Sequence, residues 1–161
     1  MSRRPLVRLW VGVLALSFIL AIAGPLRAEP DDPFLEQVER DSFQYFWDTA
    51  HPETGLIPDS DRPGSPSSIA AVGFGLTAIC IADSRGWISR EDAYARVLKT
   101  LKTVARRLDH QHGFFYHFVD MASGQRAWNS EISSIDTALF FAGALTAAQY
   151  FSGTEVERLA H

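Results

Sequence analysis

The sequence predicts an all-α chain of about four helices, with a small β-hairpin before the fourth. Four segments are either apolar at helical spacing or apolar on every side. Long connections of about 17 and 25 residues precede the second and fourth segments, and only about six residues precede the third. In antiparallel helical hairpins arranged around a ring, this alternation places both long loops at one end of the helices.

The first expected helix begins with Asp32 as its N-cap and Pro33 at its first helical position. It ends near Ala50, because His51 and Pro52 break the pattern. Its face is defined by side chains that recur at roughly helical spacing: Phe34, Leu35, Val38, Ser42, Tyr45 and Phe46. A long segment rich in Gly, Pro, Asp and Ser follows and runs to about Ser67.

The second expected helix starts at Ser67 or Ser68 and continues through Ala82 as an almost wholly apolar run of small residues. A helix that is apolar on every side is typical of a buried helix. Gly73 and Gly75 have the spacing of a dinucleotide-binding fingerprint, but no strand precedes them. Close contact between helices accounts for these glycines better.

The third expected helix opens with a capping box formed by Ser89 and Asp92. One face is apolar and the opposite face is basic, which predicts a half-exposed helix with solvated basic residues. The apolar face consists of Tyr94, Val97, Leu98, Leu101, Val104, Ala105 and Leu108; the basic face consists of Arg96, Lys99, Lys102, Arg106 and Arg107.

A period of two replaces the helical period after His112 and predicts a short strand through Phe114 to Val119. Residues 122–124 read as a turn, and residues 125–128 as the return strand. The fourth helix is expected from about Ser134 to Phe151 and should be buried. A further helix begins after Thr154, a plausible N-cap, with no stop signal before the last residue.

Residues 1–28 have the pattern of an export signal, with basic residues, an apolar core from Leu9 to Ala23 and a small residue at Ala28. Its apolar core of about fifteen residues is shorter than the roughly 20 that span a bilayer. We expect cleavage after Ala28, a periplasmic or secreted protein and no stable membrane span after cleavage. A twin-arginine signal, the general secretory route and retention as an uncleaved anchor stay open.

Removing residues 1–28 removes four arginines and no acidic residue, so 11 basic and 19 acidic residues remain and the net charge becomes −8. A chain with this charge and no basic stripe is a poor partner for nucleic acid or anionic lipid. The single cysteine, Cys80, lies in an apolar run and is expected to be a small buried residue. The sequence offers no Cys/His cluster for a metal, and we predict no cofactor.

The most informative stretch lies before the fourth helix, where aromatic residues and carboxylates gather. Aromatic faces stack on pyranose rings, and a pair of carboxyl groups flanks the scissile bond in glycosidases. Asp136 lies three residues after Ser133, so it is expected to close a capping box, to act chemically, or both. Glu131 would be partly desolvated beside Trp128, which would raise its pKa and suit a general acid; a solvated loop residue is the alternative.

Further residues could bind a sugar from the strand or from the first long loop. We place Trp128, Tyr116, His117 and Asp59 at the substrate, and we expect only one or two of the aromatic candidates, which also include Phe115 and Trp47, to face it. Asp59 has capping or turn formation as its alternative, and so does Asp61. His110 and His112 lack a third metal ligand.

Six segments also carry a resemblance to a known family: Phe43–Trp47, Gly55–Asp59, Ser67–Gly75, Arg85–Arg90, Gly113–Phe118 and Ser130–Ala138. They resemble the bacterial glucoamylase-like family, which includes endo-β-1,2-glucanases and a glucan-processing domain of cyclic β-1,2-glucan synthases. The resemblance implies an α/α toroid (six-hairpin barrel) with a double ring of about twelve helices. Residues 29–161 would be the N-terminal part of this domain, so we expect a truncated or split chain.

The resemblance implies an exported glycoside hydrolase that acts on β-linked glucan, with β-1,2-glucan favoured. Its cleft would lie near the Ser130–Asp136 segment, with Glu131 as proton donor and Asp136 as base, nucleophile or sugar-holding anion. Another essential carboxylate is expected to lie beyond His161. The alternatives are a non-catalytic truncated fragment, a weak glucan-binding module, and a helical interaction module. The last would show internal repeats, which the sequence lacks.

Overall fold

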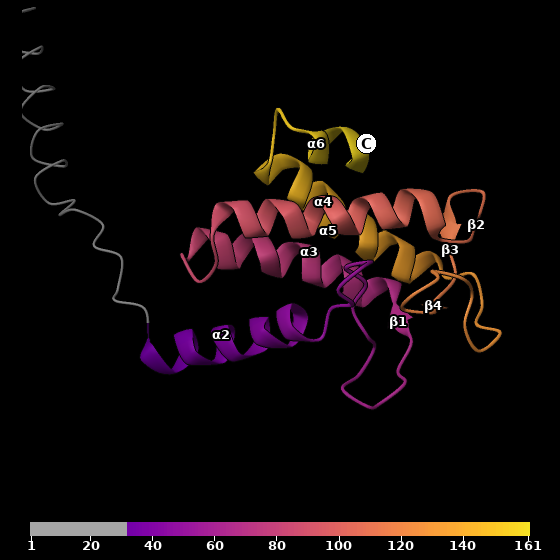
Figure 1. The fold of residues 1–161 in the computed structure, drawn as a ribbon, viewed down its shortest axis with the longest axis horizontal. Coiled ribbons are helices and arrows are strands. Elements are labelled where there is room, and N and C mark those ends of the chain that lie inside the picture. The colour runs from indigo at the N-terminus through magenta and orange to yellow at the C-terminus, as the bar shows by residue number, and fades with distance from the viewer. Residues whose placement is uncertain (1–31) are drawn as a thin grey trace, which may run out of the picture. The chain divides into compact units, whose positions relative to one another are not determined.

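The computed structural model describes residues 32–161, so the export signal predicted for residues 1–28 lies outside the described residues. Five helices and four two-residue strands follow one another in the described part of the chain (Figure 1). In order they are α2 (Pro33–Asp48), β1 (Ser67–Ser68), α3 (Ile69–Ser84), α4 (Arg90–Arg107), β2 (His110–Gln111), β3 (Phe114–Phe115), β4 (Phe118–Val119), α5 (Ser134–Tyr150) and α6 (Glu155–Ala160). The four predicted helices and the beginning of a fifth are therefore confirmed.

Side-chain caps fix where the helices begin. The Ser89 hydroxyl accepts a hydrogen bond from the Asp92 amide at the start of α4, and the Thr154 hydroxyl accepts one from Val156 at the start of α6. Both caps satisfy amides that the first helical turn leaves without a partner. Helix α3 begins differently, because the Ile69 amide donates to the His117 carbonyl at 3.2 Å. The start of α3 is therefore tied to the segment before α5.

Helices α3 and α5 pack against each other at unusually short range, and glycines make this possible. A Cβ atom built on Gly73 would lie 2.6 Å from the Phe140 Cα, and one built on Gly143 would lie 2.6 Å from the Gly73 carbonyl carbon. Neither distance is possible for real atoms. The prediction that the α3 glycines serve helix contact is confirmed for Gly73.

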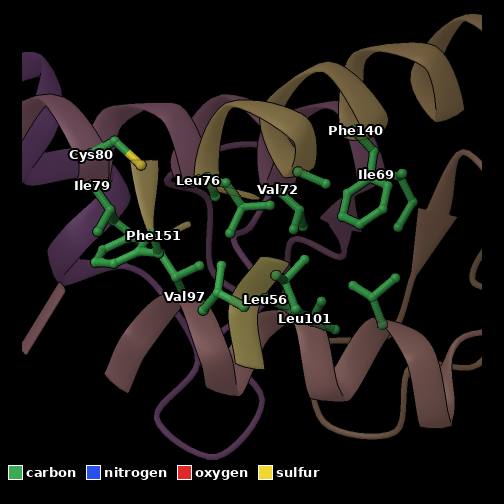
Figure 2. Packing of buried hydrophobic residues seen from close by; sticks show 14 of the residues in the cluster. Leu56, Ile69, Val72, Leu76, Ile79, Cys80, Val97, Leu101, Phe140 and Phe151 are labelled. Carbon is green, nitrogen blue, oxygen red and sulfur yellow. The ribbon is translucent and has the colours of Figure 1, made fainter. Parts of the chain in front are cut away.

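The core lies between α3 and α4, with α5 across it (Figure 2). Side chains of α3 and α4 meet there with Leu56 from the first long loop and Phe151 from the end of α5. Cys80 belongs to this core and is 4% exposed, as expected for a small buried residue. Burial raises the pKa of its thiol to about 11.

Helix α2 contacts the turn after α3 through one buried aromatic residue and two ion pairs of Arg85. Phe43 packs against the Trp87 ring at 5.8 Å, and Arg85 lies 3.3 Å from Glu36. The Arg96 side chain on α4 was expected in solvent, but its guanidinium lies 4.2 Å from the Trp47 ring and donates to the Trp47 carbonyl. A long stem and a weakly hydrated planar head let arginine pack in this way.

Two apolar faces of the described residues are exposed. One consists of Phe34, Leu35, Val38, Phe74 and Ile81 from α2 and α3, and the other of Ile135, Leu139, Phe141 and Leu145 from α5. The expectation that α3 and α5 are buried is therefore correct for only one face of each helix. As expected for a partial ring, these apolar side chains are exposed among residues 32–161.

Both long loops meet at one end of the helices, as predicted, and we call this the loop end (Figure 1). Strand β1 from the first long loop pairs antiparallel with β4 from the second, with Ser67 opposite Val119. The Thr54 hydroxyl also donates to the Met121 carbonyl at 2.8 Å.

The predicted hairpin was partly wrong. A small hairpin exists, but in it β3 pairs antiparallel with the preceding strand β2 through a turn at residues 112–113. The expected return strand contributes only an isolated bridge between Val119 and Arg126. Positive φ angles of about 53° at Trp128 and 52° at Asn129 end the extended backbone there.

Candidate active site

The N-terminus of α5 carries a buried carboxylate. The Ser133 hydroxyl accepts from the Asp136 amide at 3.2 Å and also donates to Asp136 Oδ2. The N-cap half of the predicted capping box is therefore present, but the Ser133 amide donates to the Phe115 carbonyl and not to Asp136. The Asp136 side chain is 13% exposed. The positive end of the helix dipole favours a negative charge at this position.

His117 lies between the two candidate catalytic carboxylates. Its Nδ1 atom is 3.0 Å from Glu131 Oε1, and its Nε2 atom is 3.8 Å from Asp136 Oδ1. The His117 amide also donates to the Glu131 carbonyl at 3.0 Å. Glu131 and Asp136 are therefore brought to opposite edges of one imidazole, and we call these three residues the carboxylate–imidazole cluster.

Glu131 differs from expectation in its surroundings. Its side chain is 68% exposed, and its pKa is lowered from the ordinary value. The first cause is a hydrogen bond from its own backbone amide, followed by the hydrogen bond from His117. The expected desolvation and raised pKa are wrong for the described chain, because Trp128 does not cover the carboxylate.

A row of aromatic rings leads from solvent to the cluster. The Trp128 side chain is 69% exposed, and its ring meets Phe118 edge-on at 5.2 Å. Phe118 in turn stacks on the His117 ring at 3.8 Å. The exposed indole therefore lies one ring away from the imidazole that contacts both carboxylates.

The other aromatic candidates have different surroundings. Phe115 is buried in the core, and Trp47 packs against Phe43 and Arg96. Tyr116 is half-buried; its hydroxyl accepts from Gln111 at 3.0 Å, and its ring lies under the Arg126 guanidinium at 4.7 Å. Phe115 and Trp47 are therefore packed against protein, and Trp128 is the most exposed of the aromatic candidates.

Asp59 lies on the first long loop and is exposed, and its amide donates to the Pro66 carbonyl at 2.8 Å. The structure gives it no contact with the cluster, although Pro58 pairs with Ser67 next to the β1–β4 pair. Asp59 therefore lies at the loop end without joining the cluster.

Sequence reasoning placed His117 at the substrate but missed that it joins the two carboxylates. The available signal was its position in the extended stretch, where it alternates with the buried Phe115 and Val119 and so faces inward. Arg126 was missed altogether. Its Nε and Nη2 atoms donate to the carbonyls of Ser130 and Asn129, both at 2.6 Å.

Within residues 32–161, no group of three or more His, Cys, Asp or Glu side chains is arranged to hold a metal ion. In the same part of the chain, no helix combines the length and the apolar character needed to cross a membrane. The site geometry therefore consists of carboxylates, an imidazole and aromatic rings.

The chain is similar to known proteins in both sequence and structure. In an alignment of 129 positions that covers 76% of its length, the chain is 34% identical to an exo β-1,2-glucooligosaccharide sophorohydrolase (non-reducing end) from Parabacteroides distasonis. A solved structure provisionally named a glucoamylase, from Bacteroides uniformis, matches 83% of the chain with 30% identity and a TM-score of 0.72. The endo-β-1,2-glucanase from Chitinophaga pinensis, solved with sophorotriose and glucose, matches 83% with 29% identity and a TM-score of 0.70.

The resemblance to the glucoamylase-like family is confirmed. The mostly helical structure matches glucoamylase-like α/α toroids over part of their length, and its homologues include β-1,2-glucan hydrolases. No family model matches the chain. The chain spans 18% of the length of the sophorohydrolase, 34% of the Bacteroides structure and 35% of the Chitinophaga glucanase.

Proposed function

We propose that residues 29–161 are the N-terminal part of an exported glycoside hydrolase that acts on β-linked glucan, with β-1,2-glucan as the favoured substrate. The observation that carries this proposal is the carboxylate–imidazole cluster at the loop end, reached from solvent by the exposed Trp128 indole. An aromatic face beside paired carboxylates suits a pyranose ring and its glycosidic bond. The β-1,2 linkage comes from the homologues, which act on β-1,2-glucans and include a glucanase solved with sophorotriose.

Asp136 is proposed as the base, nucleophile or anion that holds the sugar. Its carboxylate is fixed by Ser133 at the start of α5, where the helix dipole favours negative charge. A carboxylate held in one position at the positive end of a helix suits these roles better than proton donation.

Glu131 is proposed as the proton donor to the leaving oxygen. In the free chain its lowered pKa opposes this role, so the proposal requires that bound sugar or further protein covers it. Covering the carboxylate would remove water and favour its neutral, proton-carrying form. A further essential carboxylate is proposed to come from the parts of the homologous fold that residues 32–161 do not match.

Incubating protein that also contains the proposed further carboxylate with linear β-1,2-, β-1,3- and β-1,4-glucans and measuring new reducing ends tests the reaction. The expected result is release from the β-1,2-glucan that is lost in Glu131→Gln. The matched control Glu91→Gln removes an exposed carboxylate in the first turn of α4, at the end of this helix that is away from the loop end, and should keep activity. No release from any of the three glucans by that protein would refute the proposed hydrolysis.

A second candidate function is glucan binding without cleavage, and the exposed, acidic Glu131 favours it because this group holds no proton near neutral pH. Calorimetric titration with sophorotriose separates the two: heat of binding without reducing-end release indicates a binding module. Export is proposed from residues 1–28 and is tested by sequencing the N-terminus of protein recovered outside the cytoplasm, where Glu29 should come first.

A further inference from the structure

The segment that presents Trp128 has an unfavourable backbone conformation. Trp128 and Asn129 are consecutive non-glycine residues with φ angles of 53° and 52°. The left-handed region is unfavourable for a bulky residue such as Trp128 and better tolerated by asparagine, and such conformations persist where the surrounding contacts enforce them. Trp128 is also among the most exposed large apolar side chains in the described chain, at 69%. Both features need an explanation in the contacts of this turn.

Ser130 holds one side of the turn. The Ser130 amide donates to the Ala127 carbonyl at 3.0 Å and closes the turn around Trp128 and Asn129. The buried Ser130 hydroxyl accepts from the Phe118 amide at 3.2 Å and donates to the Phe118 carbonyl at 3.1 Å. The turn is thereby fixed to β4, next to His117.

Arg126 holds the other side. Its guanidinium donates to the Asn129 and Ser130 carbonyls, both at 2.6 Å, so one rigid planar group spans the C-terminal half of the turn. The same guanidinium lies over the Tyr116 ring at 4.7 Å, which anchors it to the segment before His117. Arginine suits this task because its donors form a fixed fork and its plane stacks on aromatic rings.

We propose that Arg126 is a positioning residue that holds the Ala127–Ser130 turn so that the exposed Trp128 indole forms a stacking platform for a pyranose ring beside the carboxylate–imidazole cluster. This inference rests on the proposed function for its ligand. Arg126 itself needs no contact with the sugar. It acts through the strained turn, which without the guanidinium relaxes toward ordinary φ angles and carries Trp128 away from Phe118.

Binding of sophorotriose to the full chain, measured by calorimetry, tests the platform. If Arg126→Met leaves the turn correctly formed about a tenth of the time, the apparent Kd rises about tenfold. Arg126→Lys keeps the charge but loses the fork, so it should rescue binding only in part. Arg40→Met, an exposed arginine on α2, is the matched control and should bind like the unsubstituted chain.

A double-substitution cycle separates positioning from general destabilisation. If Arg126 acts through Trp128, Arg126→Met should have no further effect on Kd in a Trp128→Ala background. An equal loss of affinity in both backgrounds, or an unchanged Kd in the single variant, would overturn the proposal while leaving the proposed function intact.

A readout without ligand keeps the inference testable if the unsubstituted chain binds no sugar, which would count against the proposed function. With 5-fluorotryptophan incorporated at the four tryptophans, the Trp128 ¹⁹F resonance is assigned by its absence in Trp128→Phe. Arg126→Met should shift or broaden this resonance and leave those of Trp47 and Trp87 in place. An unchanged Trp128 resonance would show that Arg126 does not hold the indole.

Discussion

Replacing Gly73 by alanine should destabilise the protein although alanine is the better helix former. The helix-propensity gain from Gly to Ala is about 1 kcal/mol. Against it, the new methyl would lie 2.6 Å from the Phe140 Cα and still closer to the Leu139 carbonyl oxygen, so the obstacle is backbone, which cannot rotate away. Forcing helices apart in a packed core typically costs 1–3 kcal/mol, and occasionally more. A backbone clash should cost about 3 kcal/mol, the upper end of this range, or more. After the helix-propensity gain is subtracted, we expect the free energy of unfolding to fall by about 2 kcal/mol.

For a chain of this size, the loss corresponds to a fall in Tm of about 8 °C. Thermal unfolding followed by circular dichroism measures it, and Gly143→Ala should behave alike because its methyl would meet Gly73. Gly75→Ala is the matched control, since its methyl would meet the tip of the Ile57 side chain, which can rotate. A Gly73→Ala midpoint equal to or above that of the unsubstituted chain would refute the close α3–α5 contact.

Three further predictions address individual side chains. Cys80 is 4% exposed and its pKa is raised to about 11, so at pH 8 its alkylation by iodoacetamide should be at least about a hundredfold slower than in urea-unfolded protein, followed by mass spectrometry. Comparable rates would contradict its burial. Glu131 should titrate below its ordinary value in ¹³C NMR, and His117→Ala should move the midpoint upward. Because its folded-state pKa is depressed, its contribution to stability should be present near neutral pH and disappear as the pH falls through the folded-state pKa; a midpoint insensitive to His117 would contradict the cluster. Asp136→Asn keeps a capping oxygen but removes the charge at the start of α5, so Tm should fall by only a few degrees, for a loss of about 1 kcal/mol, while reducing-end release disappears. A large fall in Tm with activity retained would assign Asp136 to capping alone.

The helices could be predicted because their signals are local. The spacing of Ser89 and Asp92 specifies the α4 cap, and the small residues around Gly73 specify a close contact. The predicted return strand was wrong because Trp128 and Asn129 adopt left-handed angles. Asparagine is common in that conformation, but tryptophan is not, so nothing in the sequence indicated this angle at Trp128. The β1–β4 pairing was not predicted because it joins residues about 50 positions apart.

The site was predicted in composition but not in arrangement. Glu131, Asp136, His117 and Trp128 were all selected from sequence, and all four lie in or beside one cluster. The Glu131 pKa was predicted in the wrong direction, because proximity to Trp128 in sequence says nothing about which side of the turn the indole covers. The two hydrogen bonds from the Arg126 guanidinium could not be predicted, because backbone carbonyls accept them. Every residue has such a carbonyl, so the sequence carries no pattern of residue types for this contact.

His117 makes the stability of the helices and the geometry of the cluster depend on each other. Its carbonyl accepts from Ile69 at the start of α3, while its imidazole contacts Asp136 at the start of α5. The relative position of α3 and α5 therefore sets the distance between that imidazole and Asp136. The same two helices also expose apolar side chains, among them Phe74 on α3 and Leu145 on α5. Covering those side chains would hold α3 and α5 more firmly in place. Packing far from the loop end would therefore narrow the range of distances between the His117 imidazole and Asp136.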